Sequence, residues 1–157
     1  MSGEGAPDEL PIDARGKRLA IVATRWHRGI VGALLAGALQ EATSCGVEDG
    51  DVEQVRVPGA FELPVVADAL ARSRRVDAIV CLGVVIRGGT PHFDYVCRAV
   101  TDGCLRVSLD HGIPVGFGVL TVDDEEQARE RVDKGRDAVR AVLETLHVID
   151  DVRGRSA

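Results

Sequence analysis

Apolar residues along this chain gather into short runs that alternate with longer stretches of helical periodicity. Residues 19–23 and 78–86 are almost entirely Val, Ile, Leu, Ala or other small residues, and residues 113–120 repeat the pattern. Runs of this length predict strands that are buried on both faces of a sheet. Residues 51–57 alternate loosely between apolar and polar types and predict a further strand.

Two helices are predicted between the first three strands. Apolar residues recur at helical spacing from residue 29 to residue 45, and Gly46 supplies a C-terminal stop. Pro64 suits the first turn of the next helix, which is expected to end near Ser73.

The longest apolar run, 78–86, ends in an Arg-Gly-Gly turn that leads into a third helix. Thr90 suits the N-cap of this helix and Pro91 its first helical position, and the helix is expected to close near Gly112. Free N–H groups at such a helix start, beside two glycines, favour binding of a phosphate or another anion. His92 follows within the first turn and is able to transfer protons near neutral pH.

The C-terminal part predicts one uninterrupted helix over residues 125–146, with Asp123 or Asp124 as its N-cap. Small or apolar residues step by 4, 3, 4, 3 and 4 positions, which is the spacing of a single helical face. The residues on this face are Ala128, Val132, Gly135, Val139, Val142 and Leu146.

The order of these elements predicts the fold class. Four strands alternate with four helices, and each connection is about helix-length, so we expect an α/β sandwich with a central parallel sheet. One domain is expected over residues 17–150, with a flexible N-terminal tail over 1–16 and a C-terminal tail over 151–157. In such folds ligands bind at the carboxyl ends of the strands.

Composition and charge exclude several classes of protein. The 157 residues are 45% apolar, and the net charge of −6 argues against nucleic acid as a partner. No apolar run approaches the roughly 20 residues of a membrane span, and the N-terminus lacks the pattern of a signal peptide, so a cytoplasmic location is expected. The four cysteines show no CxxC pair and no zinc spacing, and we expect neither a metal site nor disulfides.

Side chains that suit ligand binding follow the first two strands as well as the third. Trp26 is the only tryptophan and is either a platform for a heteroaromatic ring or a residue that finishes the core. Glu62, in the turn after the second strand, is either a hydrogen-bond acceptor for a ligand or a solvated carboxylate. Arg87 is expected to brace its loop or to meet Asp94. No Walker sequence or dinucleotide fingerprint is present, and no cofactor is expected.

Three blocks of sequence identify a family resemblance: VPGAFELP at 57–64, GVVIRGGTPHFDYV at 83–96 and FGVLT at 117–121. In these blocks, and from about residue 17 to residue 146, the chain resembles 6,7-dimethyl-8-ribityllumazine synthases. The resemblance implies a flavodoxin-like three-layer α/β/α sandwich. It also implies two small-molecule substrates, 5-amino-6-(D-ribitylamino)uracil and 3,4-dihydroxy-2-butanone 4-phosphate, which condense without cofactor or metal.

The resemblance also implies roles for individual residues. His92 takes the place of the proton donor, and a pentameric ring with active sites between subunits is implied. Phe117 would reach into the site of a neighbouring subunit. The implied pyrimidine and ribityl contacts are Trp26, Ala60, Phe61, Glu62, Val84, Val85, Ile86 and Phe117. The implied phosphate contacts are Gly89, Thr90, Arg131 and Lys134.

The chain departs from the family between Arg131 and Lys134, where only two residues remain of a longer connection. Together with the helical spacing described above, this departure predicts that the family's bend between its last two helices is absent or much tighter. The phosphate end of the site would then be altered, with Arg129 as the nearest substitute for Arg131.

Two other classes of function remain open at this stage. One is a non-catalytic member of the same family, a lumazine or flavin binder or a shell-forming scaffold. The other is a generic flavodoxin-like binding or signalling domain, although a receiver domain would carry acidic residues where this chain has Arg25 and Trp26.

Overall fold

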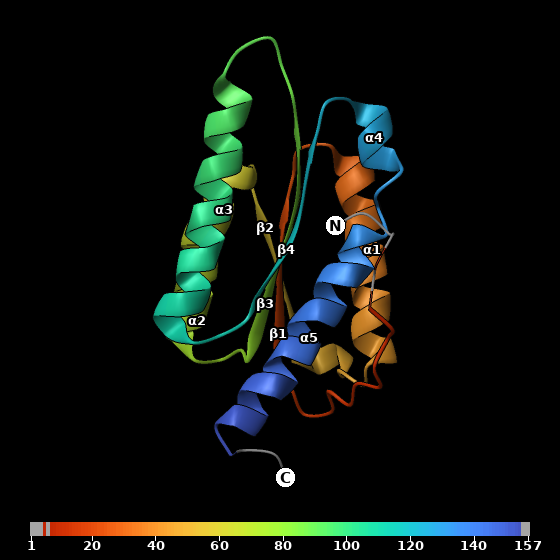
Figure 1. Ribbon diagram of the computed structural model, residues 1–157, viewed down its shortest axis with the longest axis vertical. Coiled ribbons are helices and arrows are strands. Elements are labelled where there is room, and N and C mark those ends of the chain that lie inside the picture. Colours follow the sequence, from red (N-terminus) through yellow and green to blue (C-terminus); the bar gives the residue numbers. More distant parts are fainter. Residues whose placement is uncertain (1–4, 6, 155–157) are drawn as a thin grey trace.

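The computed structural model describes residue 5 and residues 7–154 of the chain, and these form a three-layer α/β/α sandwich (Figure 1). Its four strands are β1 (Leu19–Thr24), β2 (Val52–Val57), β3 (Ala78–Ile86) and β4 (Val115–Val122). Its α-helices are α1 (Arg28–Ser44), α2 (Leu63–Ser73), α3 (His92–His111), α4 (Glu125–Arg129) and α5 (Lys134–Val152). Two short 3-10 helices, η1 (Asp49–Asp51) and η2 (Ala60–Glu62), flank β2.

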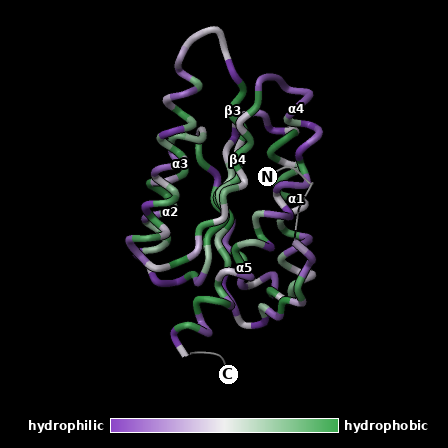
Figure 2. Tube along the Cα trace, viewed as in Figure 1, coloured by the Kyte–Doolittle hydropathy of each residue, from purple (hydrophilic) through white to green (hydrophobic). Residues whose placement is uncertain are grey.

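The sheet is parallel throughout, with the strand order β2-β1-β3-β4. Helices α2 and α3 cover one face, and α1 and α5 cover the other (Figure 1). All six residues of β1 and the first seven of β3 are buried, which explains why these two strands read as continuous apolar runs. Figure 2 shows the same pattern, with hydrophobic positions through the middle of the molecule and hydrophilic positions around α4. The expected fold class is therefore confirmed.

The two edges of the sheet differ in chemistry. The outer strand β2 carries Glu53, Gln54 and Arg56, and its burial is only partial. The other outer strand, β4, has the sequence VGFGVLTV and carries no charge. Alternate residues of β4 face opposite layers: Gly118 lies under Ala138 of α5, whereas Val119 packs with the core beneath α2 and α3.

The prediction of one continuous C-terminal helix is wrong, because the chain bends at residues 130–133, between α4 and α5. At the bend, the N–H of Arg131 donates to Ala128 and the N–H of Lys134 donates to Arg131, each at 3.1 Å. These are turn bonds between residues three apart rather than the four-residue bonds of an α-helix. The family's bend, predicted to be absent or much tighter, is thus present in a short form of four residues, and Asp124 caps α4 by accepting from the N–H of Gln127.

The predicted start of α3 is also corrected by one residue. Pro91 occupies the N-cap position, with φ of −63°, and no side chain caps the helix there. Thr90 therefore precedes the cap instead of forming it, and the first helical residue is His92. The C-terminal end agrees with expectation, since Gly112 follows α3 in a left-handed conformation with φ of 61°.

The segments expected to be tails lie partly against the domain. Ala14 is buried and its N–H donates to the carbonyl of Cys45 at 2.8 Å. Glu9 forms an ion pair with Arg136 of α5 at 2.5 Å. At the other end, α5 continues to Val152, two residues beyond the expected domain boundary. Residues 1–4, 6 and 155–157 of the expected tails lie outside the described residues.

Candidate active site at the carboxyl edge of the sheet

The carboxyl ends of β1 and β2 are joined directly. The backbone N–H of Arg25, just after β1, donates to the carbonyl oxygens of Val57 and Pro58 at 2.9 and 3.3 Å. A Cβ atom placed on Gly59 would lie 3.5 Å from Cδ1 of Trp26, so the indole lies against the turn after β2. That distance is an ordinary van der Waals contact, and the tightest neighbour of such a Cβ atom would be Oε2 of Glu62 at 3.3 Å.

Glu62 is tied to the same turn. Its Oε2 accepts a hydrogen bond from the backbone N–H of Gly59 at 2.9 Å. The bond closes η2 and fixes the carboxylate beside Trp26. Ala60, in the same turn, is buried, whereas the ring of Phe61 is 64% exposed. The turn thus presents one aromatic ring and one anchored carboxylate to the rim.

Trp26 itself is 68% exposed, so most of its ring surface is open. The next residue, His27, has a left-handed backbone with φ of 51° and forms the N-cap of α1. Its ring lies 6.4 Å from the Trp26 ring, at an angle of 46°. A non-glycine residue in this conformation is uncommon, and no local signal in the sequence predicted it.

The end of β3 supplies the third part of the rim. Val84 is buried, and Val85 and Ile86 are half-buried as the strand leaves the core. The following glycines have room around them: a Cβ atom on Gly88 or on Gly89 would meet nothing within 4 Å. The loop therefore does not need glycine for its own packing, and the space beside its backbone is open to a ligand.

Thr90 and His92 are both exposed at the end of this loop. Trp26, Glu62 and His92 follow β1, β2 and β3, three neighbouring strands of the parallel sheet. The topology therefore brings the three predicted side chains to one edge, as the sequence predicted.

Arg87 is the charged residue at the base of the loop. Its Nε donates to Asp123 Oδ1 at 2.9 Å, and its Nη1 lies 3.4 Å from Asp94 Oδ1. The guanidinium also lies over the ring of Phe93, 4.1 Å from the centroid. The hydrogen bond that Arg87 donates to Asp123, together with the negative charge of Asp94, raises the pKa of Arg87. The expectation that Arg87 braces its loop and meets Asp94 is confirmed.

Phe117 does not lie at this edge. It pairs in register with Cys81, five residues before the end of β3 at Ile86. At about 3.3 Å per residue, that places Phe117 roughly 16 Å down the sheet from the rim. Its ring is 42% exposed on the outer strand β4. Within a single chain, Phe117 is therefore separate from the group around Trp26.

Arg131 and Lys134 lie at the bend between α4 and α5, the two helices that follow β4 in the chain. Arg131 Nη1 donates to the carbonyl of Gln127 at 2.8 Å. Lys134 Nζ forms an ion pair with Asp137 at 2.6 Å, and this hydrogen bond raises the pKa of the lysine. Among the described residues, neither cation has a hydrogen bond that reaches Gly89 or Thr90. The hydrogen-bond partners of both cations therefore lie within α4, the bend and α5.

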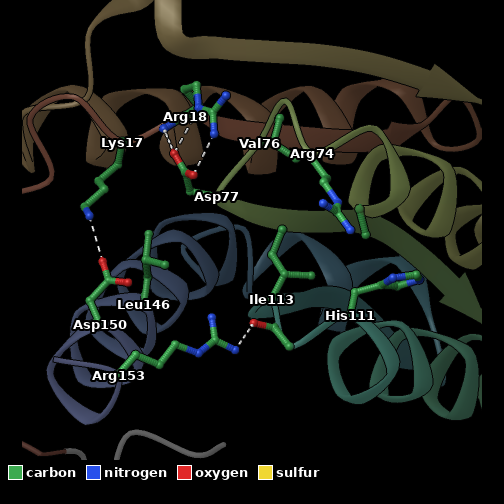
Figure 3. Close-up of a pocket in the computed structure, with 12 residues that line it drawn as sticks. Lys17, Arg18, Arg74, Val76, Asp77, His111, Ile113, Leu146, Asp150 and Arg153 are labelled. Carbon is green, nitrogen blue, oxygen red and sulfur yellow. Dashed lines mark hydrogen bonds and ion pairs between the residues drawn. The ribbon is translucent and has the colours of Figure 1, made fainter. Parts of the chain in front are cut away.

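A cavity of about 470 Å³ lies at the opposite, amino edge of the sheet (Figure 3). Ion pairs there join Lys17 to Asp150 at 2.7 Å and Arg18 to Asp77 at 2.9 Å. Arg153 donates to a carbonyl oxygen at the C-terminal end of α3, at 2.9 Å. These charges are used to hold α5 and the strand ends together and to satisfy a helix terminus. The cavity is therefore a weaker candidate for chemistry than the open rim.

Two further observations concern metal ligands and membrane spans. Within residue 5 and residues 7–154, no group of three or more His, Cys, Asp or Glu side chains is placed to hold a metal ion. None of the helices in that part of the chain has both the length and the apolar character needed to cross a membrane.

Comparison with known proteins places the chain in a family. The family model of 6,7-dimethyl-8-ribityllumazine synthase matches residues 16–150. A protein of that name from Frankia casuarinae is 57% identical, over 97% of this chain and 98% of its own length. The corresponding proteins of Kineococcus radiotolerans and a Nocardioides species are 55% and 51% identical, each over more than nine-tenths of both chains. The chain belongs to the 6,7-dimethyl-8-ribityllumazine synthase family.

Proposed function

We propose that this chain catalyses the condensation of 5-amino-6-(D-ribitylamino)uracil with 3,4-dihydroxy-2-butanone 4-phosphate in riboflavin biosynthesis. The observation that carries the proposal is family membership along nearly the whole chain, at up to 57% identity. The open rim supports it, because it combines an exposed aromatic ring, an anchored carboxylate and a histidine beside an open glycine loop. The products are 6,7-dimethyl-8-ribityllumazine, phosphate and two molecules of water.

The pyrimidine end of the site is proposed to lie around Trp26. The indole would stack on the flat pyrimidine ring, because its face is open and its edge is supported by Gly59. Glu62 and the adjoining residues of η2 would accept hydrogen bonds from the ribityl hydroxyls. The backbone groups of Val85 and Ile86, at the end of β3, would border the ring.

The phosphate end is proposed to lie at Gly89 and Thr90. The space beside both glycines of the loop and the N-terminus of α3 together suit a phosphate, since free N–H groups point out of a helix start. An amine of the pyrimidine attacks the ketone, water is lost to form an imine, phosphate leaves, and ring closure expels a second water. His92 would donate protons to the oxygen atoms that depart. Since the substrates are reactive, positioning carries much of the acceleration.

The active form is proposed to be a homo-oligomer, a pentamer with sites between subunits, in the cytoplasm. The position of Phe117 supports a shared site, because within one chain it lies about 16 Å from the rim that it would complete. Large apolar side chains also remain open on α3, where Tyr95 and Leu109 are each 73% exposed. A second copy would cover such a surface. Arg131 and Lys134, near β4, would then serve a neighbour's phosphate.

The deciding experiment supplies the purified protein with both substrates and follows lumazine formation and phosphate release together. Stoichiometric appearance of both products, faster than the unaided condensation, is expected. A protein that binds riboflavin or the lumazine but shows no acceleration would overturn the proposal in favour of a non-catalytic family member. Light scattering on the same sample tests the pentamer independently of activity.

A further inference from the structure

The loop between β3 and α3 has almost no support of its own. Within the described chain, residues 88–90 make no hydrogen bond to any other element, and a Cβ atom added to either glycine would meet nothing within 4 Å. The loop rises above the sheet beside the turn that joins β4 to α4 (Figure 1). Its shape therefore depends on its two ends, Arg87 and the first turn of α3.

Arg87 joins both ends of the loop to a third element. Its backbone N–H donates to the carbonyl of Val122 at 2.9 Å, and its guanidinium bonds Asp123 in the next position of the β4–α4 turn. The same guanidinium lies beside Asp94 and over Phe93 in the first turn of α3. One side chain thus spans the loop from its base to the helix that follows it.

The anchor at Asp123 is itself well held. Its backbone N–H donates to Oε1 of Gln127 at 3.0 Å, and the backbone N–H of Gln127 donates to Asp124 at 2.8 Å. These two bonds form the cap of α4, so the carboxylate that receives Arg87 belongs to a fixed turn. Asp94 lies at the other end of the contact, in the first turn of α3 that carries His92.

We infer that Arg87 is a positioning residue for the phosphate end of the proposed active site, with Asp123 as its anchor. It is not itself a phosphate ligand, because its charge is already shared between two carboxylates and an aromatic face. Its role is to hold the open backbone of Gly89 and Thr90, and the imidazole of His92, at a constant distance from the sheet. The expected change in KM rests on the proposed function, whereas the expected change in amide hydrogen exchange does not.

The test compares Arg87→Ala, Arg87→Lys and Asp123→Asn in the full-length protein, with Arg75→Ala as control. Arg75 forms a similar exposed ion pair with Glu53, at 3.4 Å and away from the rim. We expect Arg87→Ala and Asp123→Asn each to raise KM for the butanone phosphate about tenfold, while KM for the pyrimidine changes less than about twofold. Arg87→Lys should restore part of the loss, and the control should behave as wild type.

A second measurement separates this inference from the proposed reaction. Amide hydrogen exchange at positions 87 and 94, whose N–H groups donate to Val122 and Pro91 at 2.9 and 3.0 Å, should accelerate in Arg87→Ala and in Asp123→Asn, whether or not the protein turns over substrate. Unchanged exchange in both variants would overturn the positioning role. So would a lowered KM for the phosphate substrate in Asp123→Asn, because that is the result expected if the freed guanidinium bound phosphate directly. Absence of turnover in the wild type, with faster exchange in the variants, would reject the reaction alone.

Discussion

Gly135 lies against the backbone of Leu34 so closely that a Cβ atom at residue 135 would overlap the leucine carbonyl oxygen and lie 2.7 Å from its carbonyl carbon. This contact joins the first turn of α5 to the middle of α1, and it lies beside the bend that follows α4. The two helices can approach this closely only where one of them has no side chain.

Gly135→Ala should therefore destabilise the fold, by about 3 kcal/mol, since the obstructing atoms belong to a helix backbone that is unable to rotate away. Urea unfolding followed by circular dichroism measures the loss. Gly32→Ala is the matched control, because a Cβ atom at that exposed position of α1 would meet nothing within 4 Å. The control should gain about 0.5–1 kcal/mol from helix propensity, and equal stability of the two variants would contradict this account.

His92→Ala should slow the condensation while the fold and the assembly persist. A positioned proton donor contributes roughly 10²–10⁴-fold, and the lower end is expected because the two substrates react without a catalyst. The measurement is kcat at saturating concentrations of both substrates. His147→Ala, an exposed change on α5, serves as control and should retain full activity. Wild-type kcat in His92→Ala would remove the imidazole from the mechanism.

Trp26 should report binding through its fluorescence. It is the only tryptophan, and a flavin-like ring stacked on its open face should quench the emission in a saturable titration. Trp26→Ala should bind such a ring about 2- to 10-fold more weakly by calorimetry, whereas Trp26→Phe keeps a stacking face and should bind within about twofold of wild type. Calorimetric binding that leaves the fluorescence unchanged would place the ring elsewhere.

Glu41 should make the stability of the fold depend on acid pH. Burial opposes its ionisation, but hydrogen bonds from Arg140 and Arg136 outweigh burial and lower the pKa of its carboxyl below the usual 4.5. A lowered folded-state pKa contributes stability that is complete above the unfolded pKa and is lost as the pH falls through the folded one. The free energy of unfolding should therefore decline from about pH 5 downward.

Glu41→Gln should remove that part of the pH dependence and cost about 2 kcal/mol at neutral pH, because two guanidinium groups lose a charged acceptor. Urea unfolding at several pH values between 3 and 7 measures both effects. Glu48→Gln, at an exposed carboxylate outside any ion pair in the described chain, should leave the curve unchanged. A wild-type pH profile in Glu41→Gln would mean that other carboxylates dominate the acid transition.

The strands were the most predictable elements, because a strand that is buried on both faces requires a continuous apolar run in the sequence. The ends of β1 and β3 lie within one residue of expectation, and β4 lies two residues later than predicted, at Val115–Val122. The convergence of Trp26, Glu62 and His92 followed from the parallel topology alone. These features depend on backbone geometry that local sequence determines.

The bend between α4 and α5 was missed because hydrophobic spacing records which residues face the core, not whether the helix is continuous. Ala128 and Val139 are both buried on the same core although four non-helical residues separate their helices. The left-handed backbone conformation of His27 was not predicted either, because the position is not occupied by glycine, the residue type that usually signals it. The distance of Phe117 from the rim depended on strand register, which pairs it with Cys81 and which no local pattern specifies.

The contrast between the two outer strands bears on the risk that newly synthesised chains aggregate through their sheet edges. A row of unpaired backbone groups invites pairing with another chain, and charged side chains are a common protection against it. Glu53 and Arg56 give β2 that protection, whereas the β4 edge, VGFGVLTV, has none. In a single subunit the β4 edge is therefore the one more open to pairing with another chain, and covering it in the proposed oligomer would protect against aggregation as well as complete the proposed active site.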